Sequence, residues 1–220
     1  IQDSSPSGDR LSDRERPESR MTRVSVEAMT ATAPCYHGSE AERAGAARIE
    51  ASVGQTLEDA REALGTGRTR ITIPDTALAL AYLAPTFDPR LGTLDGLLSS
   101  GRLRVLRNRE LRHALAAWNG LLREATEEET KALRHVADQL DPVLRARMDV
   151  SGPLGLLLPF VADDLSADRL AGVSTVPIDT EVVGVLAVRH IHEAHGLDDL
   201  AAVRAEIGHI LSLIETYTPG

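Results

Sequence analysis

The chain has 220 residues, with 24 Lys and Arg against 33 Asp and Glu, so its formal net charge is −9. An acidic chain lacks the positive surface that neutralises phosphates, and an aromatic content of 3% leaves few side chains to stack on bases, so nucleic acid is excluded as an expected partner. The single cysteine, Cys35, excludes an internal disulfide framework. The sequence contains no run of 18 apolar residues, which is the length that a membrane-spanning helix requires.

The first part of the chain changes from polar to helical in composition. Residues 1–20 are rich in Ser, Asp and Arg, which predicts a flexible polar lead-in, and residues 21–220 are expected to form a single helical domain. Apolar residues recur at helical spacing over 21–32 and again, more weakly, over 44–64. The glycines at 65 and 67 should end the second of these helices.

A short β-branched segment follows. The sequence RTRITIP, residues 68–74, could form one strand, but a strand without a partner is not a sheet, so an extended connector is expected. Asp75 is then predicted to cap a short apolar helix over 76–84, which Pro85 closes.

The longest helical pattern begins at Asn108, a good N-cap residue. Its apolar positions follow at steps of three and four, which predicts a seam that packs against other helices, with Trp118 as a core residue. Asp141-Pro142 should start a new turn or kink the helix, and Glu127 to Thr130 should form a solvated face. The predicted seam consists of Leu111, Leu115, Trp118, Leu122, Ala125, Leu133, Val136, Leu140 and Val143.

The last part of the chain is rich in Gly and Pro before it becomes helical again. Residues 151–178 are expected to form short helical turns joined by loops. Asp179 should cap a helix over 180–195, Gly196 should end it, and a final helix should cover 197–217. Together these patterns predict an all-α protein, an irregular and mainly antiparallel bundle of about five or six helices.

The sequence RHIHEAHG contains the main candidate site. His192 and His195 are neighbours on a helix at i and i+3, and they could be metal ligands if another helix supplied further ones, such as His209 or carboxylates. The zinc-protease pattern H-E-x-x-H is not met, because the spacing here is H-E-x-H. The alternative is that these residues and His190 are surface or part-buried histidines near a helix C-terminus.

No catalytic residue and no cofactor follow from these patterns. Cys35 and His37 are two residues apart, which does not make a nucleophile–base pair, so a structural thiol is expected.

Residues 86–118, TFDPRLGTLDGLLSSGRLRVLRNRELRHALAAW, resemble a bacterial family of small membrane-anchored proteins catalogued as a domain of unknown function. The C-terminal sequence RAEIGHILSLIETY is similar to the final helix of that family. The positions that carry the resemblance are Thr86, Phe87, Pro89, Leu98, Ser99, Ser100, Gly101, Leu103, Leu106, Asn108, Leu111 and Arg112.

The resemblance implies one spanning helix ahead of this chain and a place at the bacterial inner membrane, with the helical domain in the periplasm, but it implies no activity. We therefore expect a non-enzymatic interaction or sensing domain that binds a protein partner or self-associates. A small-ligand or metal-binding domain is the alternative, including a hydrolase that uses His192 and His195. Within the family signature, Thr93 should cap a short helix that ends at a left-handed Gly101, which makes the Ser-Ser-Gly sequence the corner of a helix–turn–helix.

Overall fold

The computed structural model describes residues 42–84, 96, 99–157 and 171–217. Several predictions fall on residues outside this set: the lead-in over 1–20, the helix over 21–32, Cys35 with His37, and the family-signature positions from Thr86 to Leu98 with the cap Thr93.

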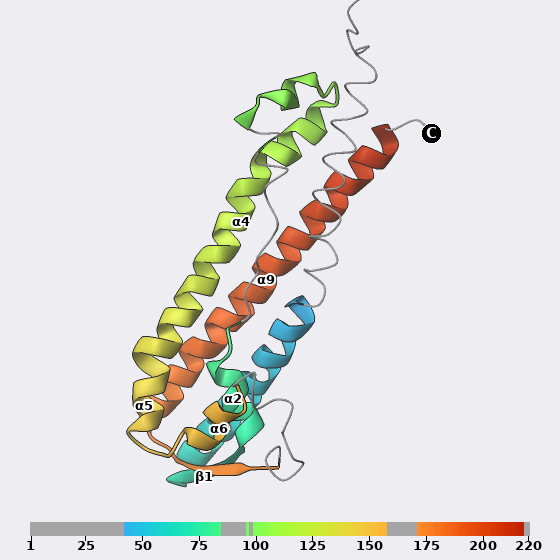
Figure 1. Ribbon diagram of the computed structural model, residues 1–220. Coiled ribbons are helices and arrows are strands. Elements are labelled where there is room, and N and C mark those ends of the chain that lie inside the picture. The colour runs from blue at the N-terminus through green and yellow to red at the C-terminus, as the bar shows by residue number, and fades with distance from the viewer. Residues whose placement is uncertain (1–41, 85–95, 97–98, 158–170, 218–220) are drawn as a thin grey trace, which may run out of the picture.

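The molecule is an elongated, mainly helical bundle, as predicted, with a small sheet at one end (Figure 1). Two long helices, α4 (Arg109–His135) and α9 (Thr180–Tyr217), lie antiparallel along the length of the molecule. A helix over residues 42–65 packs beside α9 near the sheet, where the shorter α2 (Asp75–Tyr82), α5 (Asp141–Arg145) and α6 (Ser151–Gly155) also lie. No helix in the described part of the chain is both long and apolar enough to cross a bilayer.

The sheet corrects two predictions. Strand β1 (Arg70–Pro74) pairs antiparallel with β2 (Val173–Pro177), so residues 68–74 are not merely a connector and residues 173–177 are not a loop or turn. The partner strand lies about a hundred residues away in sequence, and no short hairpin turn joins the two strands to reveal the pairing. Ile71 and Ile73 point into the core, which explains the alternating pattern of β1.

The predicted cap of α2 is also corrected. Pro74 occupies the cap position and Asp75 is the first residue of the helix. The carboxylate of Asp75 accepts a hydrogen bond of 2.6 Å from the Ser174 hydroxyl on β2, so it joins the helix to the sheet instead of capping its own helix.

Helix α4 begins where the sequence predicts. The Asn108 side chain accepts a hydrogen bond of 3.1 Å from the Leu111 backbone N–H, and a π-helical turn (Val136–Leu140) and α5 continue the helical path. Pro142 lies in the first turn of α5, where its missing N–H costs little. Leu133 is wrongly placed in the predicted seam, since it is 44% exposed. The seam instead passes through Ala132 to Val136, both buried.

Helix α9 corrects a further prediction. It continues through Gly196, where the sequence pattern predicted an end, and reaches Tyr217. A glycine inside a helix costs about 1 kcal/mol relative to alanine, and the burial of apolar side chains on both sides of Gly196 outweighs that cost. The predicted start is confirmed, because Asp179 accepts a hydrogen bond of 2.9 Å from the Val182 backbone N–H.

Two hydrophobic cores lie along the bundle. The sheet-side core joins the helix over 42–65, the sheet, α2, α5 and the first turns of α9, whereas the distal core joins the first half of α4 to the last turns of α9. Trp118 is 1% exposed in the distal core, as predicted. The main residues of the sheet-side core are Val53, Leu57, Leu78, Leu140, Leu144, Val176, Val182 and Leu186, and those of the distal core are Leu111, Leu115, Trp118, Leu122, Val203, Ile207, Ile210 and Ile214.

The backbone at Gly101 supports a testable prediction. Gly101 has φ of +66°, the left-handed conformation predicted for it, and comes directly before a 3₁₀ helix (Arg102–Val105). A valine there should destabilise the fold by about 1–2 kcal/mol, since the left-handed region is unfavourable for β-branched side chains. Gly101→Asn is the control, because asparagine tolerates this region, and urea unfolding of both variants measures the difference. Equal stability of Gly101→Val and wild type would contradict the corner.

Candidate functional site

The seam of α9 is interrupted in its middle. The side chains that face the bundle follow one another at alternating steps of four and three residues, the 3.5-residue repeat of helices packed along a common seam. Three successive positions, Arg189, Glu193 and Gly196, are not apolar. The complete series is Val182, Leu186, Arg189, Glu193, Gly196, Leu200, Val203, Ile207, Ile210 and Ile214.

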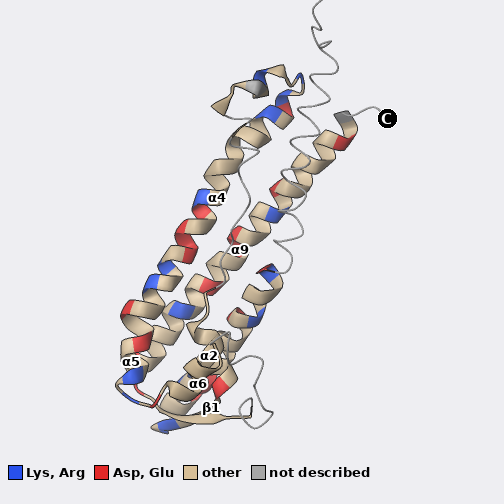
Figure 2. Cartoon of the chain, in the orientation of Figure 1, with Lys and Arg blue, Asp and Glu red and all other residues tan. Residues whose placement is uncertain are grey.

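Polar residues of α4 lie at the same level. Glu128, Glu129 and His135 of α4 meet this part of α9 between the sheet-side core and the distal core. We refer to the group at this level as the polar layer, which consists of Glu128, Glu129, His135, Arg189, His192 and Glu193. Both basic and acidic side chains occur along α4 (Figure 2).

A buried ion pair lies at the centre of the polar layer. Arg189 is 0% exposed and Glu193 is 3% exposed, and the guanidinium contacts Glu193 Oε1 one helical turn away. Arg189 Nε also donates a hydrogen bond of 2.9 Å to the Ala81 carbonyl, and Nη2 donates to the Leu83 carbonyl. These are carbonyls at the C-terminal end of α2, which lack partners within their own helix. Arg189 therefore links α9 to the end of α2.

The second oxygen of Glu193 is left without a hydrogen bond. Glu193 Oε2 is buried and has no hydrogen-bond partner among the described residues. Burial raises the pKa of the Glu193 carboxyl, the Arg189 guanidinium opposes this rise, and the charge of Glu50 adds to it. A buried acceptor without a partner costs about 1–3 kcal/mol, so this atom marks a place where a water or a ligand would be favourable.

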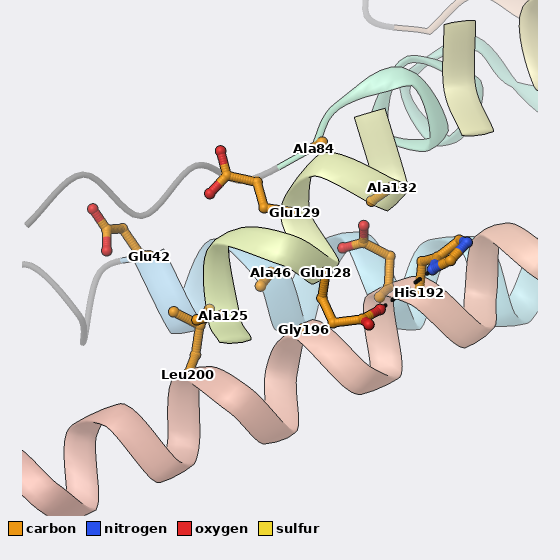
Figure 3. Close-up of a pocket in the computed structure, with 11 residues that line it drawn as sticks. Glu42, Ala46, Ala84, Ala125, Glu128, Glu129, Ala132, His192, Gly196 and Leu200 are labelled. Atoms are coloured by element: carbon orange, nitrogen blue, oxygen red, sulfur yellow. Dashed lines mark ion pairs between the residues drawn. The ribbon is translucent and has the colours of Figure 1, made fainter. Parts of the chain in front are cut away.

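A small cavity adjoins Glu193, between the helix over 42–65, α4 and α9. Its volume is about 30 Å³, enough for a water molecule or a group of similar size. Its wall combines carboxylates with small apolar side chains (Figure 3). The lining residues are Glu42, Ala46, Ala84, Ala125, Glu128, Glu129, Ala132, His192, Glu193, Gly196 and Leu200.

Glu128 and His192 connect the two long helices across this cavity. His192 Nδ1 lies 3.5 Å from Glu128 Oε2, as the dashed line in Figure 3 marks. A hydrogen bond from Lys131 lowers the pKa of the Glu128 carboxyl, so this group is held ionised. Of the predicted solvated face, Glu127 is exposed, whereas Glu128, Glu129 and Thr130 are partly buried.

His135 lies behind His192, away from solvent. Its Nε2 lies 2.8 Å from the Val185 carbonyl, and its ring centroid lies 5.8 Å from that of His192. A carbonyl accepts only from a protonated nitrogen, so Nε2 carries the proton. Burial lowers the pKa of the His135 imidazole, more than the bond to Val185 raises it.

The three histidines of RHIHEAHG point to different surroundings. His190 lies 3.6 Å from Glu50 and packs on Gly54, where an added Cβ would come within 3.1 Å of the His190 ring. His192 lines the cavity, whereas His195 is exposed in a separate open depression with Asp198 and other acidic side chains.

His192 and His195, which the sequence offered as a pair of metal ligands, therefore face two different depressions. Glu128 is the acidic residue that borders both of them. His209, named as a further candidate ligand, lies near the far end of the bundle, 3.6 Å from Glu110. Within the described ranges, no group of three or more His, Cys, Asp or Glu side chains is arranged to hold a metal ion.

Comparison of the chain with known protein families, with curated proteins and with solved structures finds no match.

The buried histidine predicts how stability depends on pH. The pKa of His135 in the folded protein is below its ordinary value of 6.5, so the unfolded chain binds protons that the folded chain does not. Stability should therefore fall as the pH drops below about 6.5, and His135 should contribute no pH dependence above that value. His135→Gln keeps a donor for Val185 but does not titrate, so its midpoint of thermal unfolding should fall less between about pH 7 and about pH 5.5. Parallel curves for the two proteins would contradict the assignment.

Proposed function

We propose that this chain is a non-enzymatic helical sensing or interaction domain, and that the polar layer with its cavity is its ligand site. The observation that carries the proposal is the buried, unpartnered oxygen of Glu193 on the wall of a cavity that interrupts a regular apolar seam. Apolar side chains at Arg189 and Glu193 would continue the seam without this cost, since a buried ion pair is often no better than well-packed apolar residues.

The arrangement also suggests how a ligand could affect the rest of the domain. The cavity borders three helices, and Arg189 extends the contact to the end of α2. A molecule that binds Glu193 changes the balance of the Arg189–Glu193 pair and hence the link between α9 and α2. A ligand shifts a conformational equilibrium only through such a difference in contacts between states.

We further propose that the domain belongs to a membrane-anchored protein of the bacterial inner membrane and lies in the periplasm, where it meets a protein partner or a second copy of itself. The support is the resemblance over the Ser-Ser-Gly and Asn108 segment, whose left-handed Gly101 and side-chain cap match the expected corner. Membrane fractionation of the full-length gene product tests this proposal. We expect recovery in the membrane fraction, and an apolar run of about 20 residues ahead of Ile1. Recovery in the soluble fraction would contradict the anchor.

The coupling between Arg189 and Glu193 gives a prediction on stability. Arg189→Met or Glu193→Leu alone should cost about 3–5 kcal/mol, because each leaves an uncompensated buried charge. The double variant should lose much less than the sum of the two single losses, and urea unfolding measures the difference. Additive losses would show that the two side chains do not form one unit.

Thermal unfolding in the presence of small probes tests the ligand site itself. The probes are ammonium chloride, sodium acetate and the uncharged molecule glycerol, each in buffer of the same ionic strength. We expect one class to raise the unfolding temperature of the wild type and to have no such effect on the Arg189→Met, Glu193→Leu double variant, since binding to the folded state stabilises it. Equal responses of the two proteins to every probe would overturn the proposed site.

A further inference from the structure

We infer that the cavity of the polar layer binds a primary ammonium group, held by Glu193 and Glu128. This inference rests on the proposed ligand site and adds the chemical class of its ligand: a small protonated primary amine.

Charge favours a cation over an anion. The described wall of the cavity carries the side chains of four glutamates and one histidine, and no Lys or Arg. The neighbouring cations are already engaged: Arg189 contacts Glu193 Oε1 and two backbone carbonyls, and Lys131 pairs with Glu128. An anion would meet four carboxylates on this wall, whereas a cation would meet acceptors.

The free acceptor is what distinguishes this site from an ordinary acidic cluster. Glu193 is 3% exposed, lines the cavity and keeps Oε2 without a hydrogen bond among the described residues. An ammonium group has three donors and no acceptor, so it can donate to Oε2 of Glu193 and keep donors for other acceptors of the wall, of which Glu128 is one. Hydrogen bonds of this kind, with both groups charged, are stronger than neutral ones.

Size and wall chemistry select a primary amine. A cavity of about 30 Å³ accepts a group the size of a water molecule, which fits an ammonium head but not a quaternary ammonium. Ala46, Ala125 and Leu200 give the same cavity apolar contacts for a short alkyl group. The described residues offer no group of three or more ligands for a metal ion.

Titration calorimetry with the intact chain tests the ligand class. Methylammonium chloride should bind, whereas tetramethylammonium chloride, potassium chloride and sodium acetate at the same ionic strength should give no binding heat. Equal binding of potassium or tetramethylammonium would overturn the ammonium assignment. Binding of acetate without binding of methylammonium would also overturn it while leaving the proposed ligand site intact. The absence of binding by every probe would remove both.

Two matched pairs of variants place the binding in this cavity. Gly196→Ala adds a methyl group where no atom lies within 4 Å, so it should fold and partly fill the cavity, and methylammonium should bind at least about tenfold more weakly. Gly120→Ala, an equally open helical glycine away from the cavity, should bind as the wild type does. Glu193→Gln should likewise weaken binding and Glu127→Gln, an exposed glutamate outside the cavity wall, should not. Unchanged binding by Gly196→Ala and Glu193→Gln would overturn the inference.

Discussion

The ion pair between Arg189 and Glu193 is the contact on which the arrangement of the middle of the molecule depends. A guanidinium that is fully removed from water needs partners for its charge and its donors: Glu193 balances the charge, and the Ala81 and Leu83 carbonyls accept hydrogen bonds from Nε and Nη2. The two carbonyls belong to the end of α2, so the demand of one side chain on α9 determines where α2 stops against the bundle. Breaking any part of this set leaves a charge or a carbonyl buried without a partner.

The polar layer also specifies how α4 and α9 align. Two apolar seams with a 3.5-residue repeat could slide by one heptad and still bury similar surfaces, whereas a charged layer matches only one alignment. Here the contacts of His135 with Val185 and of His192 with Glu128 occur at one level, and His209 meets Glu110 near the other end. A polar group within a seam lowers stability and raises specificity, which is the best-attested structural role of such groups.

The fold was predictable where local chemistry decides it. Asn108 and Asp179 cap the two long helices as expected, because an N-cap depends on residues within one turn. The pairing of β1 with β2 was not predictable, since strands so far apart in sequence are matched only by tertiary packing. Gly196 misled the prediction because glycine is the usual residue just past the end of a helix, but here the seam on both sides holds it inside α9.

The candidate site was partly predictable for the same reason. RHIHEAHG lies in the turn of α9 that carries the proposed ligand site, but its histidine spacing points to His192 and His195 and not to the seam positions Arg189 and Glu193. If the seam of the last predicted helix is extended backwards from Leu200 at steps of four and three, it reaches Gly196, Glu193 and Arg189. Charged residues at interior positions of a seam are the signal that would have identified them. Glu128 and His135 carry no comparable signal, because their role appears only when α9 is placed beside α4.

The titrating groups of the polar layer connect ligand and proton binding. Burial lowers the pKa of His135 and raises that of Glu193, so in both cases the environment favours the uncharged form. A bound cation would favour the ionised form of Glu193 and oppose the protonation of His135 nearby. Protons and an ammonium group therefore compete for the same small region, and linkage requires that each weakens the binding of the other. A domain built in this way would bind its ligand more weakly as the pH falls, without any change in the residues that contact it.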